Sequence, residues 1–231
     1  MQSQSWFMNF WQHSDYVSHS VFLILIAMSI LSWMQIIIKI LRALSRGRTQ
    51  KIVREFWQQS TIEKAIKMLE TKLGKQHIFT DIASDAVLAA NSFDNQKNGG
   101  IRKNFDRPQY LASVIHQSIN ESASKLESGM TVLASIGSVA PFVGLFGTVY
   151  GIYKALLDIS KTGAATIGAV SGPIGESLIM TAAGLFVAIP AVLAYNSFVR
   201  YNNLEMVVAN AFANDLLSFL NIGTITNTNN E

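Results

Sequence analysis

Three long stretches of the chain contain almost no charged residues, and they define its predicted architecture. They cover residues 16–38, 128–153 and 162–199, and only the third includes a charged residue, Glu176. Each stretch can provide the roughly 20 residues that a helix needs to cross the hydrocarbon core of a bilayer. The pattern therefore predicts an all-α membrane protein with three transmembrane helices.

Between the first and second stretches, apolar residues recur at helical spacing. Ile62, Ile66, Leu69 and Leu73 lie three or four residues apart, which is typical of an amphipathic helix. Gly74 is expected to end this helix. A second periodic run follows at 78–89, so this region is predicted to be helical and to lie outside the bilayer.

Pro108 is expected to lie in the first turn of another helix, because the missing N–H of proline is not needed there. No strong helix breaker follows before the second apolar stretch, and Gly129 is interpreted as a single tolerated glycine. One continuous helix from Pro108 to about Leu156 would be on the order of 70 Å long. Residues 202–220 are again periodic and are expected to pair with it. Transmembrane helices 2 and 3 are therefore predicted to extend far into the cytoplasm.

Basic residues indicate the orientation of the chain. Of its 18 Lys and Arg residues, 15 lie between Lys39 and Lys125. Six of them directly follow the first apolar stretch, namely Lys39, Arg42, Arg46, Arg48, Lys51 and Arg54. The positive-inside bias makes this flank cytoplasmic, with the N-terminus outside and the C-terminal tail inside. The same cluster is suited to attract anionic lipids, and the net charge of only +3 disfavours a nucleic-acid role.

These considerations divide the chain into seven predicted segments. They are an outer N-terminus at 1–16, transmembrane helix 1 at 17–40, a cytoplasmic helical region at 41–128, transmembrane helix 2 at 129–156, an outer loop at 157–170, transmembrane helix 3 at 171–198, and a cytoplasmic C-terminal helix and tail at 199–231.

Composition agrees with a membrane protein and gives no sign of an enzyme. The chain is 49% hydrophobic and only 14% charged, whereas about a quarter of the residues in a soluble domain are charged. It contains no cysteine, and its four histidines are dispersed, so no metal site and no cofactor are predicted. No nucleophile–base pair or phosphate-binding glycine loop occurs. Catalytic residues are therefore not expected.

Small residues line one face of each of the last two membrane segments. The glycines that contribute are Gly137, Gly144, Gly147, Gly151 and Gly184. Such faces let membrane helices approach closely. Thr148 and Thr181 add hydroxyl groups to the same faces, so both simple helix packing and the lining of a pore remain open interpretations.

Glu176 also has two interpretations. An ionisable residue within a membrane segment is costly and usually acts on protons or ions. Alternatively, Pro173 opens the third helix, and Glu176 is then stabilised in the first turn by the helix dipole. At about 100° per residue, Glu176 and Thr181 point some 140° apart, so both cannot face a pore axis squarely.

Two sequence blocks carry a specific resemblance. ASIGSVAPFVGLFGTVYGIYKALL at 134–157 and SGPIGESLIMTAAGLFVAIPAVLAYN at 171–196 closely resemble the ExbB/TolQ branch of the ExbB/TolQ/MotA bacterial proton-channel family. Within that branch they look more like the biopolymer transport protein ExbB than like TolQ. The cytoplasmic residues 49–103 carry no motif that matches.

The resemblance implies a mechanism. ExbB-like proteins assemble as a ring in the bacterial inner membrane, typically a homopentamer, around the single membrane helices of an ExbD dimer. The complex uses the proton motive force to drive TonB, which energises the uptake of iron siderophores, haem or cobalamin. Glu176, Thr148 and Thr181 would then form a polar lining of the proton pathway, opposite an aspartate of ExbD. The outer segments of this chain would lie in the periplasm.

Two alternatives remain from the sequence. The chain is a structural scaffold for an ExbD-like partner with no part in proton movement, or it is a TolQ-like subunit of the Tol-Pal envelope-maintenance system.

Overall fold

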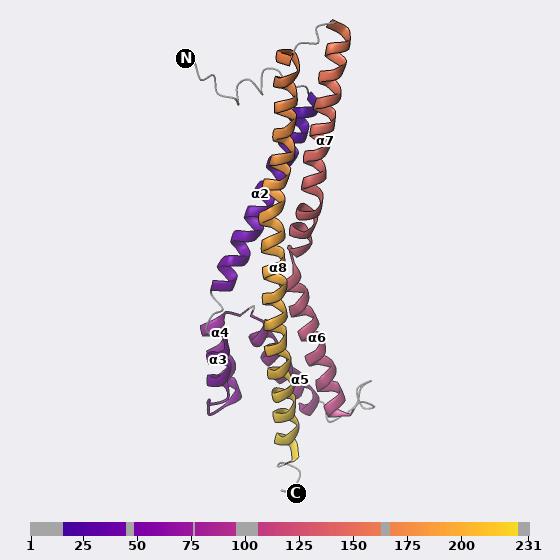
Figure 1. Cartoon of the computed structure of the whole chain (residues 1–231). Coiled ribbons are helices and arrows are strands. Elements are labelled where there is room, and N and C mark those ends of the chain that lie inside the picture. The colour runs from indigo at the N-terminus through magenta and orange to yellow at the C-terminus, as the bar shows by residue number, and fades with distance from the viewer. Residues whose placement is uncertain (1–15, 45–48, 76, 96–105, 163–166, 226–231) are drawn as a thin grey trace. The chain divides into compact units, whose positions relative to one another are not determined.

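The computed structural model describes residues 16–44, 49–75, 77–95, 106–162 and 167–225, and within them every regular element is a helix. The helices in chain order are α2 (Tyr16–Leu44), α3 (Thr49–Phe56), α4 (Ile62–Leu73), α5 (Ile78–Asn95), α6 (Arg107–Glu127), α7 (Met130–Thr162) and α8 (Ile167–Ile225) (Figure 1). The prediction of an all-α protein is confirmed for the described residues.

The chain forms two compact units. The first unit comprises residues 1–39 and 129–198, and the second comprises residues 40–128 and 199–231. Helix α8, 59 residues long, contributes its first part to the first unit and its last part to the second.

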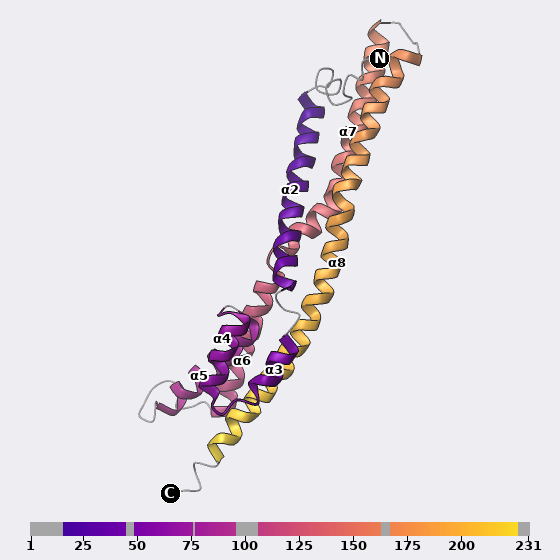
Figure 2. The same cartoon turned by 90° about the vertical axis from the view of Figure 1, so that its left-hand side faces the viewer.

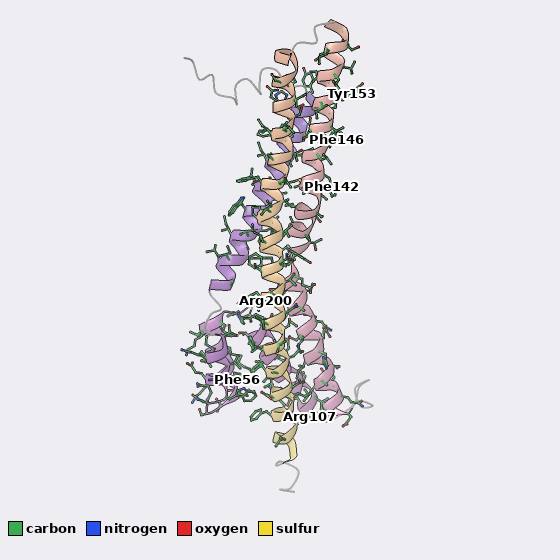
Figure 3. The ribbon with its side chains drawn as sticks, in the orientation of Figure 1. Phe56, Arg107, Phe142, Phe146, Tyr153 and Arg200 are labelled. Carbon is green, nitrogen blue, oxygen red and sulfur yellow. The ribbon has the colours of Figure 1, made fainter. Side chains whose placement is uncertain are left out.

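Three described helical stretches have the length and hydropathy of membrane spans, which confirms the predicted number. They are Tyr16–Leu41, Arg107–Lys161 and Ser171–Ile222. In the first unit, large apolar side chains point away from the neighbouring helices. Phe142, Phe146 and Tyr153 project outward from α7 (Figure 3), and Phe142 is 70% exposed. A surface of this kind is suited to contact with lipid or with another apolar protein surface, because exposing it to water carries a hydrophobic cost.

The interior of the first unit is built from smaller or tightly fitted side chains. Its buried apolar core includes Leu25, Leu133, Ala140, Met180 and Ala191, contributed by α2, α7 and α8. Helices α7 and α8 run side by side and antiparallel in both views (Figures 1 and 2). The three membrane helices thus share one buried core.

Contact between α7 and α8 is closest at two glycines. A Cβ atom added to Gly144 would lie 2.6 Å from the carbonyl oxygen of Met180 and 3.1 Å from the Cα of Gly184. A Cβ added to Gly184 would lie 2.7 Å from the carbonyl oxygen of Ala140. The two backbones therefore touch, a distance that only residues without a side chain allow.

One expectation for transmembrane helix 2 is wrong. Instead of a continuous helix, α6 ends at Glu127 and α7 begins at Met130. Gly129 between them has a φ of +78°, in the left-handed region that glycine adopts without a steric cost. The glycine that was interpreted as tolerated within a helix therefore divides it.

The second unit has a conventional buried core. Phe79, Leu69, Phe212 and Leu216 are fully buried, and the rings of Phe56 and Phe212 meet edge to face with centroids 5.0 Å apart. This core joins α3, α4, α5 and α6 to the last part of α8. The unit can therefore be stabilised by burial of apolar surface without lipid.

Helix ends in this unit largely follow the sequence signals. Gly74, with a φ of +96°, follows the last residue of α4, and Pro108 lies in the first turn of α6, both as predicted. The amide of Asn202 donates a hydrogen bond to the carbonyl oxygen of Leu126 at 3.0 Å. Residues 202–220 therefore do pack beside α6, as expected.

An ion pair ties α5 to α6. The guanidinium of Arg107 donates two hydrogen bonds to the carboxylate of Asp94, each 2.9 Å long, and a third to the carbonyl oxygen of Leu220 at 3.0 Å. A bidentate arrangement of this kind fixes geometry as well as adding energy. It holds the start of α6 against both α5 and α8.

The glycine contact leads to a test of stability. Gly144→Ala is expected to lower the free energy of unfolding by about 1–3 kcal/mol, because the new methyl group would overlap backbone that cannot move aside. The matched control is Gly175→Ala in α8, where an added Cβ meets nothing within 4 Å. Thermal unfolding in one detergent should show a lower Tm for Gly144→Ala and an equal or higher Tm for the control. Equal losses in both variants would contradict the assigned contact.

Candidate functional site

Two threonine hydroxyl groups meet where α7 and α8 pack together. Thr148 on α7 is only 7% exposed, and its Oγ1 is hydrogen-bonded to the Oγ1 of Thr181 on α8. The Thr148 Oγ1 also donates to the carbonyl oxygen of Ser177 at 2.8 Å. The structure thus brings together the two hydroxyl residues selected from the sequence.

A hydroxyl group has one proton to donate and can accept as well. When Thr148 donates to the carbonyl of Ser177, Thr181 is the donor in the bond between the two threonines. A carbonyl of Gly144 lies 3.3 Å from the Thr148 hydroxyl and offers a second acceptor. The pair can therefore reorient between acceptors without leaving a hydroxyl unpaired.

Ser177 is a member of this cluster that the sequence interpretation did not select. It is 4% exposed, and its hydroxyl donates to the carbonyl oxygen of Pro173 at 2.7 Å. Ser177 precedes Thr181 by four residues, so the two lie on one helix face. The four-residue spacing from Thr181 is the sequence feature that could have identified Ser177 as a member of the cluster.

Glu176 lies apart from this cluster. Helix α8 begins at Ile167, so Glu176 lies well past the first turn, and the alternative in which Pro173 opens the helix is wrong. The carboxylate is partly exposed, and no hydrogen bond or ion pair joins it to another described residue. Glu176 and Thr181 are both partly exposed, whereas Thr148 is buried.

The five predicted small-face glycines all lie at close contacts within the first unit. Besides Gly144 and Gly184, an added Cβ on Gly137 would lie 2.5 Å from Cγ2 of Val192, and one on Gly151 would lie 2.1 Å from the hydroxyl of Ser177. On Gly147 it would lie 3.0 Å from Met180 and from Val21 of α2. These glycines therefore allow α7 to approach its own neighbours.

The basic flank is described only in part. The ammonium of Lys39 lies 5.9 Å from the ring centroid of Phe198, within the range of a cation–π interaction, and this side chain is buried. Lys51 and Arg54 are exposed on α3. The side chain of Arg42 and all of Arg46 and Arg48 lie outside the described residues. Lys51 and Arg54 are therefore in a position to meet anionic groups.

Chemically, the cluster suits proton or ion movement better than covalent catalysis. Hydroxyl groups stabilise a passing charge by donating or accepting hydrogen bonds, and they also join membrane helices through interhelical hydrogen bonds. Within the described part of α8 that belongs to the first unit, Glu176 is the only carboxylate.

Comparisons with known proteins agree with this chemistry. Residues 81–210 match the family described as the MotA/TolQ/ExbB proton channel family. Biopolymer transport protein ExbB of Xanthomonas campestris pv. campestris is 42% identical over 90% of this chain and 83% of its own length.

Two further relatives are similar over comparable lengths. Biopolymer transport protein ExbB of Neisseria meningitidis serogroup A is 35% identical over 89% of this chain and 92% of its own length. Tol-Pal system protein TolQ of Haemophilus influenzae is 32% identical over 88% of this chain and 89% of its own length. The chain therefore belongs to the MotA/TolQ/ExbB proton channel family and, with its three apolar helices, is a multi-pass bacterial membrane protein.

Proposed function

We propose that this chain is the ring-forming stator subunit of a TonB–ExbB–ExbD complex in the bacterial inner membrane. The complex uses the proton motive force to drive TonB-dependent uptake of iron siderophores, haem or cobalamin. The observation that carries the proposal is the partly buried Thr148–Thr181 hydroxyl pair at the contact of α7 and α8. Among relatives that match most of this chain, two ExbB proteins are 42% and 35% identical and a TolQ protein is 32% identical, which supports the TonB system over the Tol-Pal system.

In this proposal Glu176, Thr148 and Thr181 form the polar lining of the proton pathway. An ExbD dimer inside the ring supplies the aspartate that carries the proton. The partial exposure of Glu176 supports this division of roles between the ring subunit and ExbD, because its carboxylate is accessible to a neighbouring subunit or partner helix. Moving one charge through 100 mV releases about 2.3 kcal/mol, so several protons supply enough energy for a conformational cycle.

The ring, typically a pentamer, uses head-to-tail contacts, which close when the rotation between subunits permits. The N-terminus lies in the periplasm and the C-terminus in the cytoplasm, and the exposed basic residues Lys51 and Arg54 meet anionic lipids there. The basic residues between Lys39 and Lys125 support this orientation.

Deletion of the gene tests the system that the chain serves. Growth on siderophore-bound iron should be lost and should return with the wild-type gene, because TonB would no longer be energised. Detergent tolerance and cell division should stay normal. Detergent sensitivity with filamentation, and intact growth on siderophores, would instead identify a Tol-Pal role.

Variants of the lining test its part in proton movement. Thr148→Val and Glu176→Gln should each reduce TonB-dependent siderophore uptake by about tenfold or more. Thr148→Val removes a hydroxyl hydrogen bond, whose loss costs about 1.4 kcal/mol, and Glu176→Gln removes the ionisable group. Thr148→Ser, which keeps the hydroxyl, should retain most of the uptake. Ser197→Ala, at an exposed hydroxyl of α8, is the matched control. Normal uptake by both lining variants, with the complex assembled, would support a structural scaffold instead.

Orientation is testable by cysteine labelling, because the chain contains no cysteine. Ser160 near the end of α7 and Asn120 in α6 are both exposed. In intact spheroplasts, a membrane-impermeant maleimide should label Ser160→Cys and should label Asn120→Cys only after permeabilisation. The reverse pattern would invert the proposed topology.

A further inference from the structure

A groove in the second unit lies between α5 and α6, which Figures 1 and 2 show side by side. Its volume is about 350 Å³. The lining residues used below are Asp85, Leu88, Val114, Gln117, Ser118 and Glu121. All of these residues lie in the second unit, and none belongs to the hydroxyl cluster.

Two carboxylates give the groove a negative potential. Asp85 comes from α5 and Glu121 from α6, and no salt bridge to either is present among the described residues. The amide of Gln117 donates to the carboxylate of Glu121 at 2.9 Å and so holds it in place. Each carboxylate is therefore able to accept further hydrogen bonds from a cation.

The nearby Lys125 is affected by the negative charges of the groove but does not neutralise them. Its ammonium donates to Asp81 at 2.9 Å, and this hydrogen bond, with the charges of Asp81, Glu121 and Asp85, raises the pKa of Lys125 above its ordinary value. Three carboxylates thus act on one lysine. The site keeps a net negative charge at neutral pH.

A buried hydroxyl in the wall of the groove lacks a hydrogen-bond partner among the described residues. Ser118 is 3% exposed, and its Oγ has no hydrogen-bond partner among the described residues. A buried polar group without a partner costs stability, and most such groups in native proteins are satisfied. A donor that enters the groove would satisfy this oxygen.

The shape and lining favour an organic cation over a metal ion. No group of three or more His, Cys, Asp or Glu side chains in the described part of the chain converges to hold a metal. Leu88, which is 63% exposed, and Val114 provide an apolar wall beside the carboxylates. Lysine and arginine fit such a surface, because their methylene stems pack on apolar groups while their charged heads reach carboxylates.

We propose that the groove binds a Lys- or Arg-bearing segment of a partner polypeptide, with the cationic head between Asp85 and Glu121 and a donor to Ser118. The choice of partner rests on the proposed orientation, because the cytoplasmic flank of a membrane-spanning partner carries an excess of Lys and Arg. The charge and the unpaired hydroxyl of the groove do not depend on that orientation.

A direct binding measurement tests the proposal. The full-length protein, in nanodiscs of zwitterionic phosphatidylcholine, is titrated into a fluorescent peptide of two lysines and two arginines flanked by glycines, and anisotropy is recorded. Saturable binding is expected, and it should weaken as the salt concentration rises. A peptide with glutamines in place of the basic residues should not bind.

Matched variants locate the site. Asp85→Asn with Glu121→Gln should raise the Kd for the basic peptide by about tenfold or more, since two charge-assisted hydrogen bonds are lost. Glu63→Gln with Asp215→Asn makes the same change in net charge at two exposed positions elsewhere in the second unit, and it should change the Kd by less than about twofold. Equal effects of the two double variants would overturn the proposal.

Ser118→Ala separates a ligand site from a packing role. It should weaken peptide binding and also raise the Tm of the protein without peptide, because the unpaired hydroxyl is removed. Unchanged affinity in this variant, absent binding by the wild type or equal binding of the glutamine peptide would each overturn the proposal. None of these measurements uses proton conduction, so their failure is distinguishable from failure of the proposed function.

Discussion

The structure of the first unit depends on the backbone contact between α7 and α8 at Gly144 and Gly184. Lipid tails are as apolar as leucine side chains, so burial of apolar surface drives helix association in a bilayer only weakly. Close van der Waals packing must supply the attraction instead, and it requires residues without side chains at the contact. Because the two backbones touch there, Thr148 and Thr181 are brought within hydrogen-bonding distance of each other.

Close packing and polarity are therefore coupled in this unit. The threonine hydroxyls and Ser177 are tolerated because each has a partner: Thr148 bonds the Ser177 carbonyl across the helix contact and the Thr181 hydroxyl, and Ser177 bonds the Pro173 carbonyl of its own helix. Polar groups that lack partners are costly in a dry environment, and the pairing removes that cost. Glu176 has no hydrogen-bond or ion-pair partner among the described residues of the chain, so its carboxylate is available for contacts with another chain.

The second unit is stabilised differently. Phe56, Phe79 and Phe212 meet in an aromatic core, and Arg107 joins α5, α6 and α8 through Asp94 and the carbonyl of Leu220. Burial of apolar surface from water contributes most to such a core. Gly129 ends the α6–α7 continuity, so each unit can adopt the helix directions that its own interior requires.

The sequence by itself determined the helical class, the three membrane spans and most helix boundaries. The length of an uncharged apolar run indicates whether a segment lies in lipid, and the spacing of apolar residues indicates a helical backbone. The family blocks also pointed to Thr148 and Thr181. Only the tertiary structure decided that Gly129 breaks a helix and that Ser177 belongs with the threonines. Whether a glycine adopts positive φ, and which hydroxyl meets which carbonyl, depends on the packing of residues distant in sequence, which a local pattern does not encode.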